Sequence, residues 1–173
     1  MTEIKKASLN DLVVITELAA TSFMESHGHS GPEKDIKNYI DANFTLKTFE
    51  NELNDPKNNY YIIYYNNKAA GFSNIIFNAA YKSIKEKNIT KLSRLYLKKE
   101  FIGLNLGKAL FDFNVELSKQ NLQKAMWLYV WVENKPALDF YKKAGFVKVE
   151  DTFFKISKTH YNPNYIMFLD FYL

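Results

Sequence analysis

The pattern of apolar and polar positions predicts one strand followed by three helices in the first third of the chain. Apolar residues recur at intervals of three and four from Leu9 onward, and do so again after Pro32 and after Thr45. Ser8, Pro32 and Thr45 are residue types that favour helix starts. The predicted elements are a strand at 3–7, a helix at 9–23, a polar loop at 26–32, a helix from Pro32 through Phe44, and a short helix from Thr45 that ends near Asp55-Pro56.

From Tyr60 the pattern becomes typical of strands. Residues 60–65 are β-branched and aromatic, and Asn66-Asn67 is typical of a hairpin turn. The run 126–132 is almost continuously apolar, as expected of a strand buried on both faces. The predicted elements are strands at 60–65, 69–77 and 89–97, an amphipathic helix from 106 that frays at Asn121, a strand at 126–132, a helix from Asn134 to Gly145, and strands at 146–156 and 165–172 separated by a polar loop that holds His160, Asn162 and Pro163.

This order of elements predicts a mixed α/β (α+β) fold in which helices pack around a central, partly antiparallel sheet. With 173 residues, the chain is long enough for one domain with a sizeable core and short for two. It has no internal repeat, low-complexity tract or linker. We therefore expect a single domain over residues 1–173.

The composition excludes several classes of protein. The absence of cysteine excludes disulfide scaffolds, Cys-ligated zinc and thiol catalysis. His27 and His29 are interpreted as polar loop residues and not as metal ligands, because the third histidine is far away at position 160. No apolar run approaches the roughly 18 residues of a membrane span, and the N-terminus lacks a signal peptide's apolar core. We therefore expect a cytoplasmic protein with no metal and no membrane partner.

The net charge of +4 and pI near 9.0 raise the question of an anionic partner. The lysines are dispersed, and Glu86 interrupts their densest run, so the pattern favours a solvated face over a nucleic-acid surface. We expect no nucleic-acid partner. A positive field also suits a cofactor that carries several phosphates.

The segment from Arg94 to Lys108 carries the first chemical feature. A strand runs into a glycine-bearing loop that opens a helix, which gathers backbone N–H groups at a helix N-terminus, where a pyrophosphate is favoured. Gly103 and Gly107 leave room for phosphates to approach the backbone. Two glycines before a helix are also compatible with a plain turn. The spacings typical of dinucleotide sites and of phosphate loops are absent.

A second motif follows the strand at 126–132. Its residues fit the pattern N-x-x-A-x-x-F-Y-x-x-x-G-F and are Asn134, Ala137, Phe140, Tyr141, Gly145 and Phe146. With the preceding loop, this motif resembles the GNAT N-acetyltransferase superfamily. The resemblance implies a mostly antiparallel central sheet of about seven strands flanked by helices, and an acyltransferase that uses acetyl-coenzyme A (acetyl-CoA) as cosubstrate.

The resemblance also implies roles for individual residues. The loop 102–108 would bind the pyrophosphate, and the bulged strand 94–97 would pair with the pantetheine arm. The N–H of Leu95 or Tyr96 would stabilise the oxyanion, and the Tyr141 hydroxyl would protonate the leaving thiolate as the catalytic acid. Tyr141 is equally a residue type found in helix cores. The implied cofactor-binding residues are Leu95, Tyr96, Leu97, Ile102, Gly103, Leu104, Asn105, Leu106, Gly107, Lys108, Asn134, Ala137, Phe140, Tyr141 and Lys143.

Three positions depart from the family pattern. Ile102 stands where Arg or Gln is usual, Asn105 where glycine is usual, and Val132 where many relatives have Glu. A left-handed backbone is tolerated by Asn, although its side chain could crowd the phosphates. We expect these changes to weaken cofactor affinity without removing the backbone N–H groups.

The N-terminal half resembles, more specifically, the bacterial spermidine/spermine N-acetyltransferase branch. The segments that carry this resemblance are Thr21-Ser22-Phe23, Tyr39-Ile40, Phe44-Thr45, 49–53 and 60–65. It implies a small amine acceptor of polyamine type, for which carboxylates such as Glu25 and Glu133 and aromatic faces are candidate contacts. The general base stays open among Glu133, His27 and an ordered water.

Several alternatives remain open. The acceptor could be a protein N-terminus or lysine, an aminoglycoside or an amino acid. The chain could also be a non-catalytic acyl-CoA sensor, an alternative that Ile102 and Asn105 keep open. A monomer and a homodimer are both compatible with the sequence.

Overall fold

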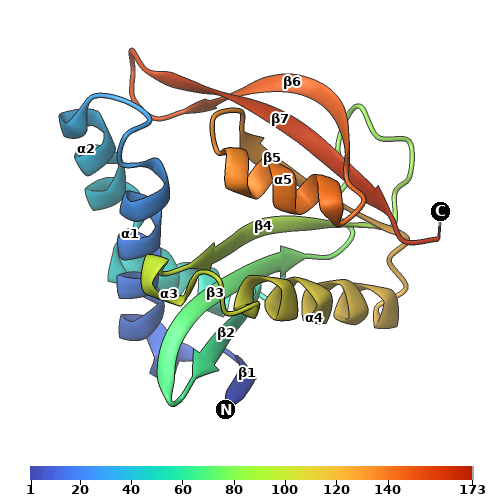
Figure 1. Cartoon of the computed structure of the whole chain (residues 1–173), viewed down its shortest axis with the longest axis horizontal. Coiled ribbons are helices and arrows are strands. Elements are labelled where there is room, and N and C mark those ends of the chain that lie inside the picture. Colours follow the sequence, from blue (N-terminus) through green and yellow to red (C-terminus); the bar gives the residue numbers. More distant parts are fainter. Residues whose placement is uncertain (173) are drawn as a thin grey trace. The chain divides into compact units, whose positions relative to one another are not determined.

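The computed structural model describes residues 1–172, with helices and strands in the predicted order (Figure 1). The elements are β1 (Thr2–Lys6), η1 (Leu9–Asp11), α1 (Leu12–His27), α2 (Glu33–Asn43), α3 (Leu46–Asn54), β2 (Asn59–Tyr65), β3 (Lys68–Ile76), β4 (Ile89–Leu97), η2 (Lys99–Phe101), α4 (Leu106–Gln120), β5 (Ala125–Trp131), α5 (Lys135–Lys143), β6 (Val147–Lys155) and β7 (Tyr161–Asp170).

The strands form a seven-stranded sheet in the order β1-β2-β3-β4-β5-β7-β6. Strand β4 runs parallel to β5, whereas the pairs β1-β2, β2-β3, β5-β7 and β6-β7 are antiparallel. The predicted fold class, a mixed and mostly antiparallel sheet flanked by helices, is confirmed.

The chain divides into two compact units. Unit 1 comprises Met1–Ile75 and Arg94–Asn114, and unit 2 comprises Ile76–Ser93 and the chain from Val115 onward. Strand β4 and helix α4 each contribute residues to both units. The expectation of one domain over residues 1–173 stays a prediction.

The core of unit 1 packs α1 and α3 against β2 and β3. Burying an aromatic or branched aliphatic side chain contributes about 1.5–3 kcal/mol, so this cluster is a main source of the unit's stability. The hairpin between β2 and β3 turns at Asn66 and Asn67, whose φ values of 47° and 63° suit a tight hairpin and confirm the predicted turn. The buried cluster consists of Ile15, Leu18, Ala19, Phe49, Tyr60, Ile62 and Phe72.

Two helix starts in unit 1 are capped by the predicted side chains. Ser8 accepts a hydrogen bond from the Asn10 N–H at 3.3 Å, and the Asp11 carboxylate accepts one from the Ser8 N–H at 2.9 Å. Thr45 accepts a hydrogen bond from the Thr48 N–H at 3.1 Å. Such caps satisfy donors that have no partner inside the helix.

Helix α1 is longer than predicted. It continues through Ser26 and His27, which the sequence analysis assigned to a loop, and the Gly28 N–H still bonds back to the helix. The Ser26 hydroxyl donates to the Ser22 carbonyl at 2.7 Å. A polar side chain that bonds to the preceding turn is tolerated within a helix, so polarity alone did not locate the end of α1.

In unit 2, β5 is an interior strand of the sheet, paired with β4 on one side and β7 on the other. Its residues are buried except for Tyr129, which is 38% exposed, and this confirms the predicted strand buried on both faces. Ile89 of β4, Trp127 of β5 and Ile166 of β7 belong to one buried cluster. These residues hold β5 in place and so fix the start of the segment that leads to α5.

A loop between β3 and β4 covers part of this core. The Trp127 Nε1–H donates to the Ala79 carbonyl at 2.6 Å, and the Tyr81 hydroxyl donates to a Glu150 carboxylate oxygen at 2.6 Å. The Ser83 hydroxyl donates to the same carboxylate. The hydrogen bonds from Ser83 and Tyr81, together with the Lys82 ammonium, hold the pKa of Glu150 below its usual range.

The last hairpin differs from the prediction. Strand β7 begins at Tyr161, so Asn162 and Pro163 lie in the strand and their assignment to a loop was wrong. The turn closes instead at residues 157–160. Pro163 is tolerated because a strand can hold a proline where no ladder hydrogen bond is required from its nitrogen, and its carbonyl still accepts the Val132 N–H at 3.0 Å.

Candidate functional site

In unit 1, the loop between β4 and α4 presents a group of backbone donors. Gly103 and Asn105 have φ values of +91° and 58°, so the backbone turns twice through the left-handed region. The Ala109 N–H bonds to the Asn105 carbonyl at 3.0 Å, whereas the N–H groups of 103–108 donate to no oxygen among the described residues. Unpaired donors at the start of a 15-residue helix form a site that favours an anion.

The space beside this loop is open. A Cβ added at Gly103 would meet no heavy atom within 4 Å, and one added at Gly107 would meet only the end of the Leu97 side chain, at 3.2 Å. A phosphate can therefore approach the backbone at both glycines. The loop fits the pyrophosphate group that the sequence analysis assigned to it.

The side chains of the loop add little positive charge. Ile102, which replaces the usual Arg or Gln, is 67% exposed and apolar. The Lys108 ammonium is paired with the Asp112 carboxylate one turn further along α4. Any anion at this loop would therefore be held mainly by backbone N–H groups and the helix dipole.

The end of β4 is held closely against β3. A Cβ added at Gly71 would lie 2.3 Å from the Tyr96 carbonyl oxygen and 2.5 Å from a Leu97 methyl carbon. The Lys98 N–H donates to the Ala70 carbonyl at 2.9 Å. The sequence analysis missed Gly71, although a glycine inside a strand often marks a close backbone approach.

The carboxylates considered for the acceptor have different surroundings. Glu25, at the end of α1, accepts the Lys99 N–H through Oε2 at 2.7 Å, which ties α1 to the turn η2. Glu133 is an exposed residue of unit 2 that lies directly before α5. Glu25 is thus already bonded to the backbone that leads into the loop 102–108.

Several aromatic rings of unit 1 pack near the side chain of Tyr96. The His27 ring stacks on Phe23 with centroids 4.6 Å apart, and its edge approaches the Tyr96 ring at 6.3 Å. Phe23 also stacks on Tyr39 at 5.1 Å. Burial raises the pKa of Tyr96 to about 12. The Tyr96 side chain is therefore a neutral phenol near pH 7.

His27 is neutral at the same pH. Burial, and to a lesser degree the charge of His29, lowers the pKa of His27 to about 4. The Ser26 hydroxyl donates to the Ser22 carbonyl, and its oxygen lies within hydrogen-bond distance of the His27 Nδ1, at 2.7 Å. Among the three candidates for the general base, His27 is hence a weak one.

In unit 2, α5 carries the second set of predicted site residues. The Asn134 side chain accepts the Ala137 N–H at 3.3 Å, which confirms Asn134 as the cap of α5. Tyr141 is 8% exposed, and its ring meets those of Phe140 and Phe146 at 5.3 Å each. These contacts fix the phenol ring on the buried side of α5. Lys143 lies on the exposed side.

The predicted residues therefore form two local groups. Leu95 to Leu97 and the loop 102–108 follow one another in unit 1, where β4 ends and α4 begins. Asn134, Ala137, Phe140, Tyr141 and Lys143 follow one another along α5 in unit 2. The roles predicted for these residues stay predictions.

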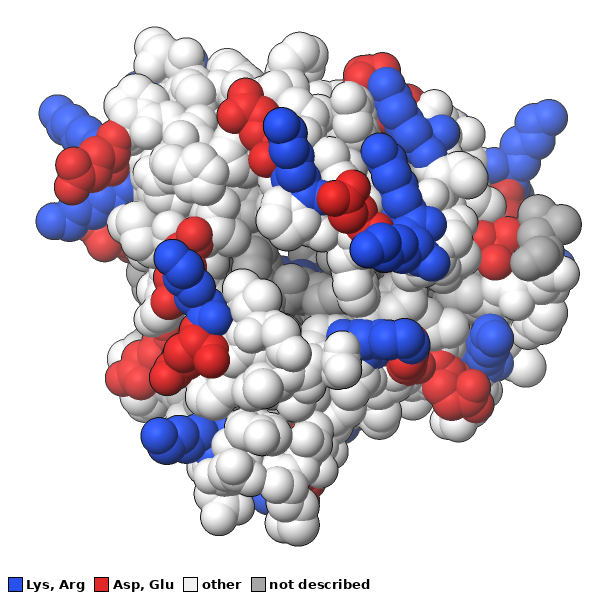
Figure 2. Space-filling model, in the orientation of Figure 1, with Lys and Arg blue, Asp and Glu red and all other residues white. Residues whose placement is uncertain are grey.

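The surface carries charges of both signs. Figure 2 shows basic side chains beside acidic ones over the visible face, and several form ion pairs, such as Lys47 with Glu50 at 2.9 Å. Across residues 1–172, no helix has both the length and the apolar character needed to cross a membrane. In the same part of the chain, no three His, Asp or Glu side chains are grouped to hold a metal ion.

Comparison with known proteins identifies a sequence family. The sequence model of the acetyltransferase (GNAT) family matches residues 14–146. The chain is 31% identical over 150 residues to the spermidine N(1)-acetyltransferase of Thermoplasma acidophilum, a match that covers 87% of this chain and 90% of that protein. It is 24% identical over 152 residues to an uncharacterised N-acetyltransferase of Lactobacillus delbrueckii subsp. lactis, with 88% of each chain covered.

A solved structure has the same fold. The crystal structure of the PaiA N-acetyltransferase of Thermoplasma acidophilum in complex with coenzyme A superposes with a TM-score of 0.81. The sequences are 24% identical, and the match covers 99% of each chain.

Proposed function

The chain belongs to the GNAT acetyltransferase family, and we propose from this premise that it transfers the acetyl group of acetyl-CoA to a primary amine of a small, polyamine-like molecule. As a member of this family, it is an acetyl-CoA-dependent N-acetyltransferase. The observation that carries the proposal is the row of unpaired N–H groups at the start of α4, beside a loop with open space at Gly103.

The residues that would hold acetyl-CoA belong to both local groups. The N–H groups of 103–108 would bind its pyrophosphate, and 95–97 would pair with its pantetheine arm. Asn134 and the exposed Lys143 would contact the cofactor from α5. Acetyl-CoA supplies the thioester whose acetyl group is transferred.

The residues around the thioester would divide the chemistry between them. The N–H of Leu95 or Tyr96 would donate to the thioester oxygen as negative charge develops there. The Tyr141 hydroxyl would donate a proton to the departing sulfur. The chain has no cysteine that could form an acyl-enzyme through a thiol, so direct attack by the amine in a ternary complex is the simplest route.

The acceptor assignment draws on the relative and on the composition of the chain. The relative from Thermoplasma acidophilum acts on spermidine, according to its name. Glu133 is an exposed carboxylate, a group that attracts ammonium ions. The predicted cytoplasmic location, and the assembly as a monomer or homodimer, stay predictions.

The test is an assay of thiol release from acetyl-CoA with spermidine, spermine, putrescine, amino acids, aminoglycosides and short peptides as acceptors. Release that depends on a polyamine supports the proposal, whereas release that depends only on peptides would identify a protein acetyltransferase. Coenzyme A binding without release under any condition would favour a sensor, the alternative that Ile102 and Asn105 suggest.

A substitution tests the acid. Tyr141→Phe keeps the packing of the ring and removes the proton donor, so kcat should fall by about 10²- to 10⁴-fold with little change in the KM for acetyl-CoA. Tyr161→Phe, at a tyrosine that is 47% exposed on β7, is the matched control and should leave kcat unchanged. Equal kcat values for both variants would contradict the assignment.

A further inference from the structure

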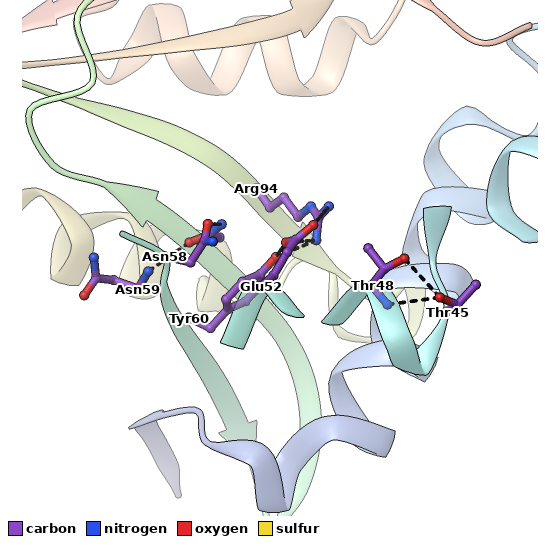
Figure 3. Close-up of polar contacts among 8 residues, drawn as sticks. Thr45, Thr48, Glu52, Asn58, Asn59, Tyr60 and Arg94 are labelled. Atoms are coloured by element: carbon purple, nitrogen blue, oxygen red, sulfur yellow. Dashed lines mark hydrogen bonds and ion pairs between the residues drawn. The ribbon is translucent and has the colours of Figure 1, made fainter. Parts of the chain in front are cut away.

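A partly buried ion pair joins three elements of unit 1. The Arg94 guanidinium of β4 donates to both carboxylate oxygens of Glu52 on α3, at 3.0 and 3.2 Å. The Tyr60 hydroxyl of β2 accepts a third bond from Arg94 at 2.5 Å and donates to Glu52. Figure 3 shows these three side chains converging from their separate elements. The side chains of Arg94 and Glu52 are only 19% and 27% exposed.

Aromatic rings cover the guanidinium. Its central carbon lies 4.9 Å from the ring centre of Phe49, 5.6 Å from that of Phe44 and 5.9 Å from that of Tyr60. A bidentate carboxylate, a hydroxyl and three rings together restrict both the position and the orientation of the planar group. Arg94 is therefore fixed much more firmly than an arginine on the surface.

The pair lies next to the strand segment assigned to the thioester. Tyr96 follows Arg94 by two residues, about 7 Å along an extended strand. The other end of this segment is held by the bond from the Lys98 N–H to Ala70 and by the close approach at Gly71. The segment 95–97 is thus fixed from both ends.

We propose that Glu52 and Tyr60 are positioning residues for acetyl transfer. They hold Arg94, and through it they fix the N–H groups of 95–97 at the angle that stabilises the oxyanion. The inference rests on the proposed function, since that function gives the segment its catalytic role. Oxyanion stabilisation depends steeply on donor geometry, and a displacement of about 1 Å can reduce the rate by about 100-fold.

The chain supplies a matched control on the same helix. Glu52→Gln keeps the size of the side chain and removes the charge that neutralises Arg94. Glu50→Gln makes the same change at an exposed pair with Lys47, whose side chains are 43% and 75% exposed. Exposed surface pairs of this kind contribute little to stability, so Glu50→Gln should behave as the wild type.

Three measurements test the proposal, at a temperature where every variant is folded. For Glu52→Gln we expect kcat to fall by about tenfold or more, the Kd of coenzyme A to stay unchanged, and amide exchange to accelerate in 94–97 but not in 103–108. A fall in Tm with unchanged kcat and unchanged exchange in 94–97 would show that the pair only stabilises the fold, and would overturn the proposal.

A second variant and a second readout keep the test decisive. Tyr60→Phe removes one hydroxyl and leaves the ion pair, so it should lower kcat in the same direction by a smaller factor. If Glu52→Gln does not fold, unchanged kcat and exchange in Tyr60→Phe overturn the proposal. If the wild type transfers acetyl to no amine, the proposed function fails, and amide exchange in 94–97 still decides whether Glu52 holds this segment.

Discussion

Gly103→Ala tests whether the loop between β4 and α4 binds coenzyme A through the shape of its backbone. The φ of Gly103 is +91°, and a Cβ added there would meet no heavy atom within 4 Å. The substitution therefore changes the backbone energy and leaves packing unaltered. A left-handed conformation costs an ordinary L-residue about 1–2 kcal/mol.

This strain should appear in one of two measurable quantities. If the loop keeps its shape, the free energy of unfolding falls by about 1–2 kcal/mol and coenzyme A binds as before. The neighbouring Ile102 and Leu104 are 67% and 45% exposed, so little packing holds the loop in place. We therefore expect the loop to relax in the free protein, and the Kd of coenzyme A to rise by about 5- to 30-fold.

Titration calorimetry with coenzyme A and urea unfolding measure the two quantities separately. Asn105→Gly is the converse variant, because it relieves a left-handed φ of 58° and removes a side chain from the loop proposed to bind the pyrophosphate, and its Kd should not rise. If Gly103→Ala leaves both the Kd and the free energy of unfolding at wild-type values, the loop conformation is not what binds the cofactor.

Two further substitutions test other parts of unit 1. Gly71→Ala places a Cβ 2.3 Å from the Tyr96 carbonyl oxygen, so the free energy of unfolding in urea should fall by about 1–3 kcal/mol, and wild-type stability would refute the close approach. His27→Phe keeps the stack on Phe23 and removes a group whose pKa is lowered to about 4 by burial. In the unfolded chain the His27 imidazole takes up a proton near pH 6.5, whereas in the folded protein it stays neutral down to about pH 4. The wild type therefore keeps its full stability above pH 6.5. As the pH falls from 6.5 toward 4, its free energy of unfolding should drop by up to about 3 kcal/mol more than that of the variant. Equal pH dependence of unfolding in both proteins would contradict the burial of His27.

The order of elements could be predicted because its determinants are local. Ser8, Thr45 and Asn134 are capping side chains within three residues of the donors that they satisfy. The two errors, at the end of α1 and at the start of β7, concern polar residues whose partners decide their conformation. Pro163 lies in a strand although proline is a residue type typical of turns, because pairing with the neighbouring strands overrides the local preference.

In the candidate site too, features set by neighbouring residues could be predicted, whereas contacts between distant residues could not. The loop at Gly103 could be predicted from its glycines and the helix that follows, since strand, turn and helix start lie within a few residues. Arg94 could not be assigned a partner, because Glu52 and Tyr60 are 42 and 34 residues away in sequence. Only the packing of α3 and β2 against β4 brings these side chains together.

The position of Arg94 gives a structural role to residues of the segments that resemble the polyamine branch. Phe44, Phe49 and Glu52 offer a carboxylate and aromatic faces, which is the chemistry expected of a site for a cationic amine. In the structure a cation already occupies this site, and it is the chain's own guanidinium. These residues therefore hold Arg94 of β4 in place, and the ammonium groups of an acceptor require other carboxylates. Glu133 is exposed and adjoins the cap of α5, the helix that carries Tyr141, which makes it the first carboxylate to test for acceptor binding.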